Sequence, residues 1–375
     1  MRIETFEMER MQCLYENEVE YNLSESGVYP LSMEELLEGE ELRSVLSVPL
    51  GYPYSNGSPA LRERIARFYP GASPEHVTVM NGGSEVNHVV LWTLLEPGDR
   101  LAFMVPNYMQ GWGLGRHFGA GSDAFRSRLG EDGSGRRWAL DVDELRRAVT
   151  ERTKAILVTN PNNPTGAVLT GEEMAGVIEA AGRVGAWIIA DEIYRGAEVD
   201  GETTPTFWGR YDKLVVTSGL SKAFGLPGLR LGWAVAPPAL IEQLWIHHDY
   251  TTLTPSTLSE RLASVVMEPA RREDVLARTR GIIRRNLPIL EEWAAGHGDL
   301  LDYVRPAAGA IAFLGYDLPI ESPALVERIR LEQSVLLVPG EQFGMGWQLR
   351  IGFGSDPDHL RKGLERVSET LRQAG

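Results

Sequence analysis

Short apolar runs alternate with longer amphipathic stretches through the middle of this chain. The runs have the length of buried strands and lie at residues 101–105, 155–159, 186–190, 214–217 and 231–236. Helical periodicity is found between runs of this kind, at residues 84–95, 142–149 and 171–184. Strands that are apolar throughout must be covered on both faces. The pattern therefore predicts an α/β fold with a mostly parallel sheet and helices on both faces.

The pattern changes after about residue 254. Long charged helices are predicted at residues 259–266 and 274–296, then strands at 310–314, 335–339 and 348–352 and a terminal helix at 359–372. We expect a large α/β domain over residues 45–253 and a smaller α+β domain formed by residues 1–44 together with 254–375. The N-terminal segment has no sheet of its own. Residues 121–137, rich in Gly, Ser, Asp and Arg, are expected to form an exposed loop.

Composition and charge exclude several classes of partner. The chain has 375 residues and a formal net charge of −15, which argues against general binding of nucleic acid or anionic membranes. Cys13 is the only cysteine, so no intrachain disulfide can form and a reducing cytoplasm is the expected setting. The N-terminus does not have the pattern of a signal peptide, and no run approaches the length of a membrane span. We expect a soluble cytoplasmic protein.

The most informative segment runs from Thr217 to Trp233. Lys222 lies on a turn of small residues that follows an apolar run, and Arg230 comes eight residues later. A poorly solvated lysine beside a fixed cation favours the neutral amine, which can form a Schiff base with an aldehyde. Arg230 can hold a phosphate through its planar donors. Taken alone, such a lysine is more often a solvated surface residue.

Two further segments offer parts of a binding site. In Asn81-Gly-Gly-Ser-Glu85, glycines at a helix N-terminus let backbone N–H groups approach a phosphate, although a glycine turn capped by Ser84 explains the same letters. In Val105-Pro-Asn-Tyr108, a rigid turn can present the ring of Tyr108 to a planar heterocycle, or the ring can simply pack.

Three polar residues lie at or beyond the ends of apolar strands. Asn163 belongs to the rigid loop Asn160-Pro-Asn-Asn-Pro-Thr-Gly166 and can offer an amide donor. Asp191 closes a buried strand, where it needs a cation such as a protonated pyridine nitrogen, unless it is a helix N-cap. Arg350 lies in the strand at 348–352 and needs an anion, which is either a substrate α-carboxylate or an internal salt-bridge partner.

Together these motifs resemble the fold-type I pyridoxal phosphate (PLP)-dependent aminotransferases of class I/II, the group that includes aspartate aminotransferase. The resemblance runs from about Gly51 to Gly354. It implies that Lys222 is the cofactor lysine and catalytic base. It also implies cofactor contacts from the pyridine partner Asp191, from Tyr194 and Asn163 at the phenolic oxygen, from the stacking ring of Tyr108, and from Gly83, Ser84, Ser221 and Arg230 around the phosphate.

The resemblance also implies a homodimer and a substrate site. The loop at residues 51–57 is similar to a family loop whose tyrosine reaches the phosphate of the neighbouring subunit, and Tyr52 is that tyrosine by its spacing to Gly57. Arg350 would bind the substrate carboxylate, with Asn163 and Gly27 beside it. Two departures stand out. Many members have a serine at the position of Gly219, for which Ser218 or Ser221 can compensate, and residues 22–28 lack the usual Gly-Glu-Pro pattern.

The implied activity is transfer of the amino group of an α-amino acid to a 2-oxo acid, through a Lys222 aldimine and a quinonoid. A lyase, a β/γ-replacement enzyme or a cyclase on the same fold is the alternative, because these chemistries share the lysine and the aspartate. A PLP-fold regulatory protein is disfavoured by the acidic charge. No metal is expected, since the adjacent His247 and His248 point to different sides of an element. The glycines at residues 111–115 do not have dinucleotide-binding spacing.

Overall fold

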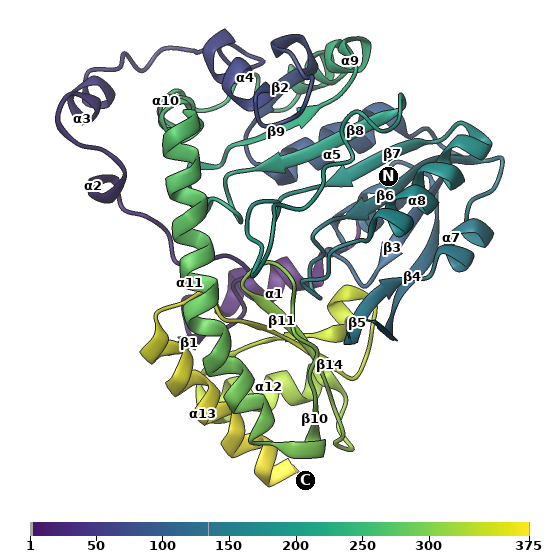
Figure 1. Ribbon diagram of the computed structural model, residues 1–375, viewed down its shortest axis with the longest axis vertical. Helices are drawn as coiled ribbons and strands as arrows, with labels where there is room; N and C mark the ends of the chain where they lie inside the picture. The colour runs from purple at the N-terminus through teal and green to yellow at the C-terminus, as the bar shows by residue number, and fades with distance from the viewer. Residues whose placement is uncertain (1–2, 134, 375) are drawn as a thin grey trace.

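The fold is described from a computed structural model that covers residues 3–133 and 135–374. Its main layer is an eight-stranded sheet (Figure 1). The strand order is β2 (Val77–Met80), β9 (Gly232–Val235), β8 (Leu214–Gly219), β7 (Trp187–Asp191), β6 (Thr153–Thr159), β3 (Arg100–Val105), β4 (Gly121–Asp132) and β5 (Gly135–Leu140). The five strands from β8 to β4 are parallel, and β9 runs antiparallel to both of its neighbours. The predicted mostly parallel α/β sheet is confirmed.

Helices cover both faces of this sheet because alternate strand residues point to opposite sides. Ile156 and Val158 of β6 pack with one group of helices, whereas Ala155 and Leu157 pack with the other. The first face is covered by α7 (Val142–Ala148) and α8 (Gly171–Val184). The second is covered by α5 (Gly83–Leu94), α6 (Gln110–His117) and α9 (Pro238–His248).

A second, four-stranded antiparallel sheet lies in the lower part of Figure 1. Its order is β10 (Leu301–Asp302), β11 (Ile311–Tyr316), β14 (Gln348–Gly352) and β13 (Val338–Pro339). It is accompanied by α12 (Ser322–Gln333) and α13 (Pro357–Ala374), while α10 (Thr257–Val266) precedes the long helix α11 (Pro269–Ala295). Helix α11 extends from the upper layer to the lower one.

The N-terminal segment is tied to this lower part. Strand β1 (Tyr21–Asn22) pairs in parallel with β12 (Val335–Leu336), and α1 (Glu7–Tyr15) lies between the two sheets (Figure 1). The short helices α2 (Met33–Leu36), α3 (Gly39–Leu46) and α4 (Pro59–Ala66) lead from there to the large sheet. The segment thus has no separate sheet, but it contributes a strand to the C-terminal part of the chain.

The prediction of an exposed loop at residues 121–137 is wrong. Strand β4 pairs with β3 from Gly121 to Arg126, and its outer half forms an antiparallel hairpin with β5. The segment lies at the edge of the sheet, where one side of each strand can face water, so it needs no continuous apolar run. Arg100 and Asp123 form an ion pair across adjacent strands, which explains how charged residues are tolerated there.

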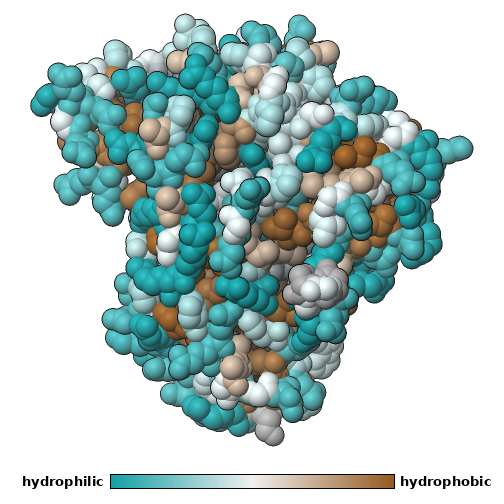
Figure 2. Space-filling model, viewed as in Figure 1, coloured by the Kyte–Doolittle hydropathy of each residue, from teal (hydrophilic) through white to brown (hydrophobic). Residues whose placement is uncertain are grey.

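The surface agrees with the acidic, polar composition. The face drawn in Figure 2 is mostly hydrophilic, with apolar side chains gathered near its middle. In the part of the chain that the structure describes, no helix combines the length and the apolar content needed to cross a membrane.

Candidate active site

A cavity of about 280 Å³ lies where the parallel strands of the large sheet end. Loops after β3, β6, β7 and β8 contribute to its wall, as expected for a sheet of this kind. Helix α1 and the segment after β1 also contribute. The structure brings together most of the residues singled out from sequence, namely Gly83, Ser84, Tyr108, Asn163, Asp191, Tyr194, Ser221, Lys222 and Arg230.

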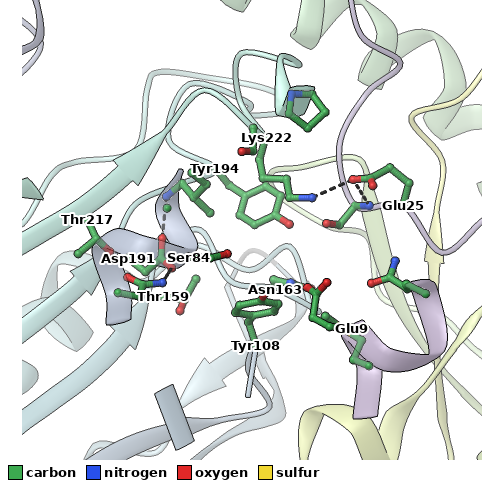
Figure 3. A pocket seen from close by; sticks show the side chains of 18 of the residues that line it. Glu9, Glu25, Ser84, Tyr108, Thr159, Asn163, Asp191, Tyr194, Thr217 and Lys222 are labelled. Carbon is green, nitrogen blue, oxygen red and sulfur yellow. Dashed lines mark hydrogen bonds and ion pairs between the residues drawn. The ribbon is translucent and has the colours of Figure 1, made fainter. Parts of the chain in front are cut away.

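Lys222 forms an ion pair that the sequence did not indicate. Its Nζ lies 2.8 Å from Oε1 of Glu25, and the same oxygen accepts hydrogen bonds from the backbone N–H groups of Ser26 and Gly27 (Figure 3). Burial acts to lower the pKa of Lys222, but the Glu25 carboxylate outweighs it and raises that pKa above its ordinary value. Lys222 in turn lowers the pKa of Glu25 to about 2. The expectation of a neutral amine is therefore wrong for this state of the protein.

Asp191 ends β7 on the opposite side of the cavity from Glu25 (Figure 3). Its carboxylate accepts hydrogen bonds from the backbone N–H of Ile193 at 3.1 Å and from Nδ2 of Asn87 at 3.3 Å. Burial raises the pKa of Asp191 to about 6, because no cation lies within ion-pair distance among the described residues. A buried carboxylate without a cationic partner is stabilised by any cation placed against it.

Two tyrosines flank the space between Asp191 and Lys222. Tyr194 is buried, at 3% exposure, and its hydroxyl has no hydrogen-bond partner within 3.5 Å in residues 3–133 and 135–374. Tyr108 donates its hydroxyl to Oε1 of Glu9 at 2.7 Å, and its ring meets the edge of Phe6. Burial, reinforced by Glu9, raises the pKa of Tyr108 well above its ordinary value. Both tyrosines are therefore neutral donors at physiological pH.

The N-terminus of α5 lies beside Arg230. Gly82 precedes the helix with φ of 89°, and a Cβ at Gly82 would lie 2.7 Å from Nη2 of Arg230. The guanidinium can therefore lie against the backbone only because this residue is glycine. Arg230 itself has φ of 43°, a left-handed conformation found at functional sites, and no carboxylate lies within 4.0 Å of it in the described chain. Its Nη1 donates to the carbonyl oxygen of Pro227 at 3.1 Å. Helix N–H groups and a guanidinium without a carboxylate partner suit a phosphate.

The position of Gly219 has a structural reason. A Cβ there would lie 2.8 Å from the carbonyl oxygen of Leu231, so β8 and β9 leave no room for a side chain. Ser218 donates its hydroxyl to the carbonyl oxygen of Glu192 at 3.3 Å. Ser221 lines the cavity, and its hydroxyl has no partner in the described part of the chain. Of the two serines, Ser221 is the one free to meet a ligand.

Arg350 is almost fully buried without an ion pair. It is 1% exposed, and no carboxylate lies within 4.0 Å of it among the described residues, so the internal salt bridge considered from sequence is not formed. Its Nη1 donates to Oδ1 of Asn163 at 3.1 Å, its Nη2 donates to the carbonyl oxygen of Ser24, and its Nε has no partner. Burial lowers the pKa of Arg350. A Cβ at Gly27 would lie 3.8 Å from Cδ of Lys222, so Gly27 is close to the amine side.

Tyr52 does not reach the cavity of its own chain. It is 88% exposed and lies at a separate surface hollow formed with Pro53, Asn81 and the loop at residues 252–257. His248, considered for a metal, is buried with Nε2 3.6 Å from Glu85. No group of three or more possible metal ligands is found within residues 3–133 and 135–374.

Sequence reasoning missed the acidic side of the cavity. Glu9 and Glu16 belong to or cap α1, and Glu25 follows β1. The seven-residue spacing of Glu9 and Glu16 indicates a shared helix face, but nothing local tells which surface that face meets. Asn87, the partner of Asp191, was also not singled out, although it lies one turn after Ser84 on α5.

Comparisons with known proteins extend these observations. The model of the family described as aminotransferase class I and II matches residues 46–367. The chain is 33% identical over 320 residues to capreomycidine synthase of Streptomyces vinaceus, which covers 84% of this chain and 80% of that protein. A PLP-dependent aminotransferase from Streptococcus suis 89-1591 matches with a TM-score of 0.92 and 30% identity, over 100% of this chain and 99% of that one. The PLP-dependent cyclase OrfR matches with a TM-score of 0.88, 28% identity and coverage of 100% and 99%.

The lining of the cavity fits PLP. The orphaned hydroxyl of Tyr194 is a donor without a protein acceptor, and Asp191 is a buried carboxylate without a cation. The glycine cradle at α5 and Arg230 supplies a site for a phosphate, and Lys222 supplies an amine. Each unsatisfied group thus has a counterpart in a phosphorylated pyridine aldehyde.

Proposed function

Because the chain belongs to the aminotransferase class I and II family and PLP is its cofactor, we propose that it is an aminotransferase that moves the amino group of an α-amino acid to a 2-oxo acid. PLP supplies an aldehyde carbon and a pyridinium ring that takes up the electron pair released at the substrate α-carbon. The observation that carries the proposal is the position of Lys222, whose amine lies in one cavity with Asp191 and Tyr194.

Lys222 has two tasks in this proposal. Its Nζ would bond the cofactor aldehyde and, as a free amine, would take the substrate α-proton and later return a proton. The ion pair with Glu25 keeps the free amine charged, so the amine must lose a proton before it acts as a base. Glu25 lies 2.8 Å from Nζ and orients the ammonium, but its lowered pKa makes it an ion-pair partner and not the acceptor of that proton.

Asp191, Tyr194 and Asn163 hold the ring. Asp191 keeps a proton at the ring nitrogen, because a buried carboxylate of raised pKa is best satisfied by a cation. Tyr194 and Asn163 donate to the phenolic oxygen, and Tyr108 stacks on the ring. The phosphate is held by the backbone and side chains of Gly83 and Ser84, by Arg230 and by Ser221.

Arg350 binds the substrate α-carboxylate. The support is its buried guanidinium, which has no carboxylate partner and donates to Asn163, and whose Nε has no hydrogen-bond partner among the described residues. A carboxylate bound there gains charge-assisted hydrogen bonds in a site of low dielectric constant. Gly27 is the second residue that we propose beside the substrate, since its backbone N–H donates to the Glu25 carboxylate that pairs with Lys222.

We further propose that the active unit is a homodimer. Tyr52 is exposed and outside its own cavity, which supports its use by the phosphate of the neighbouring subunit. Oligomers of this kind share a site across a two-fold interface.

A cyclase, lyase or β/γ-replacement enzyme is the second candidate. It is favoured by the likeness to capreomycidine synthase and to a PLP-dependent cyclase. The cavity alone does not separate these reactions, because Lys222 and Asp191 serve all of them.

Product formation without an amino acceptor tests the proposal. The holoenzyme is incubated with single amino acids and no 2-oxo acid, and products are identified by mass spectrometry. Transamination yields about one 2-oxo acid per active site and then stops until a 2-oxo acid is added. Continued turnover without acceptor, or a cyclic or eliminated product, would overturn the proposal in favour of the second candidate. Lys222→Ala should lower the rate by roughly 100- to 10,000-fold, whereas the exposed Lys362→Ala should not change it.

A further inference from the structure

One side of the cavity is formed by acidic residues of α1 and of the segment after β1. Glu9, Gln12, Cys13 and Glu16 all line the cavity, and their spacing puts them on one face of the helix. Glu25 joins them from the other segment. In Figure 3, Glu9 and Glu25 lie on the side of the cavity away from Asp191. This side is called the acidic wall, defined as Glu9, Glu16 and Glu25.

The three carboxylates of the acidic wall influence one another. Burial raises the pKa of Glu16, and the negative charges of Glu25 and Glu9 raise it further. In the described part of the chain, neither Glu9 nor Glu16 has a cation within 4.0 Å. Glu9 accepts only the neutral hydroxyl of Tyr108, at 2.7 Å. Glu25 is thus paired with Lys222, whereas Glu9 and Glu16 are carboxylates without an ion pair in the described part of the chain.

The cations that act on this wall have other tasks. Lys222 and Arg350 are the two that lower the pKa of Glu25. In the proposed function, Arg350 binds the substrate carboxylate, and Lys222 would either bond the cofactor or, as a free amine, pair with Glu25. Neither cation is then available to Glu9 or Glu16, whose side chains line the cavity. The buried, unpartnered hydroxyl of Tyr194 independently marks this cavity as built for a ligand.

We propose that the acidic wall selects an α-amino acid whose side chain ends in a guanidinium or an ammonium group. This inference rests on the proposed function, because it names the substrate class of the same site. A cationic side chain pairs with Glu9 and Glu16 while Arg350 holds the α-carboxylate. An acidic side chain meets three like charges, which gives selectivity by repulsion as well as by attraction.

A neutral isostere separates charge from shape. Arginine and citrulline have side chains of similar length and form, but only arginine is charged. We expect the holoenzyme to bind arginine more tightly than citrulline by roughly tenfold or more, with ornithine or lysine also above norleucine and with glutamate weakest. The apparent dissociation constant comes from the absorbance change of the bound cofactor, which reports binding in either reaction class.

Variants of the acidic wall test whether its carboxylates cause the preference for arginine over citrulline. Glu16→Gln and Glu9→Gln should each reduce the arginine-to-citrulline ratio by several-fold to roughly tenfold, with little change for citrulline alone. Glu18→Gln is the matched control, because Glu18 is an exposed glutamate that does not line the cavity. An equal loss for arginine and citrulline would indicate a structural role and would overturn the assignment.

The possible outcomes distinguish this inference from the proposed aminotransferase function on which it rests. Oxo-acid formation from neutral or acidic amino acids, with no preference for cationic ones, would overturn the inference and leave the aminotransferase standing. A preference for arginine with a cyclic or eliminated product would support the inference and overturn transamination. If no amino acid changed the absorbance of the bound cofactor, both the inference and the proposed aminotransferase function would be overturned.

Discussion

Lys222 and Glu25 form the ion pair that sets the charge of the Lys222 amine. The raised pKa of Lys222 contributes stability that is present below the lysine's ordinary value of 10.5 and is lost as the pH rises through the folded pKa. The lowered pKa of Glu25 contributes stability that is present above 4.5 and is lost as the pH falls toward about 2. The pair is partly exposed, at 24% and 47% of the two side chains, so solvent weakens both contributions.

Glu25→Gln should change how the protein captures PLP. Removing the carboxylate lowers the pKa of Lys222, so a larger fraction of the amine is neutral at a given pH. The curve of capture rate against pH should shift toward lower pH, with the rate at neutral pH rising roughly tenfold for each unit by which the pKa falls. Stopped-flow absorbance of the apoprotein mixed with PLP measures it. An unmoved curve, equal to that of Glu18→Gln, would show that Glu25 does not control the amine.

At the residue scale, the sequence predicted the positions of those side chains that depend on local pattern alone. Lys222, Asp191 and Asn163 each follow or close a strand of the parallel sheet, and the carboxyl ends of such strands meet, so their common cavity could be expected. Glu25 lies 197 residues from Lys222 in the chain and follows no strand of that sheet. Only the closure of the N-terminal segment over the sheet brings the two together.

At the scale of elements, the close approach of β8, β9 and α5 shapes the anion site. A Cβ at Gly232 would lie 2.6 Å from the backbone nitrogen of Gly83, and a Cβ at Gly219 would lie 2.8 Å from Leu231. These glycines are needed because backbone, not a flexible side chain, occupies the space. The helix N-terminus is thereby held against β9, which pairs with β8, the strand that precedes Lys222.

Gly219→Ser should therefore destabilise the protein instead of adding a phosphate ligand. The forced shift of β8 against β9 should lower the free energy of unfolding by about 1–3 kcal/mol and weaken PLP binding. Thermal unfolding and cofactor titration measure the two effects. The control is Gly228→Ser, since nothing lies within 4 Å of a Cβ at Gly228. A Gly219→Ser protein of unchanged stability and tighter PLP binding would contradict this reading.

Element prediction succeeded where burial forces a pattern and failed where it does not. The apolar runs that correspond to β3, β6, β7 and β8 are buried on both faces, so their apolar residues were enough to predict the strands. Strands β4 and β5 lie at the edge of the sheet, and their polar residues are indistinguishable from a loop until the hairpin ladder is known. The resemblance to class I/II aminotransferases is confirmed by the family match over residues 46–367.

At the scale of the whole molecule, the N-terminal segment joins the C-terminal part and covers the cavity of the large sheet. Strand β1 pairs with β12, and α1 lies between the two sheets (Figure 1). Glu9 and Glu16 of the acidic wall belong to α1 or cap it, and Glu25 follows β1. We propose the division into residues 45–253 and residues 1–44 with 254–375 on this basis. The sequence could not place α1 over the cavity, because that position depends on contacts between segments far apart in the chain.

Subunit complementation tests the shared site. A heterodimer of Tyr52→Ala and Lys222→Ala chains, isolated through two different tags, has one site with both an intact lysine and an intact tyrosine from the partner. It should have about half of the wild-type activity per dimer. The reciprocal heterodimer, of wild-type and doubly substituted chains, should be far less active. The opposite order of activities would place Tyr52 at its own cavity.

The central claim is that Lys222 bonds PLP, and borohydride reduction followed by peptide mass spectrometry tests it most directly. The chain has four lysines, and Lys154, Lys213 and Lys362 lie outside the cavity. A label on any of these three would therefore be distinguished from a label on Lys222. The account predicts a phosphopyridoxyl group on Lys222, which an added amino donor prevents. A label on another lysine, or none on a protein that retains PLP, would contradict it.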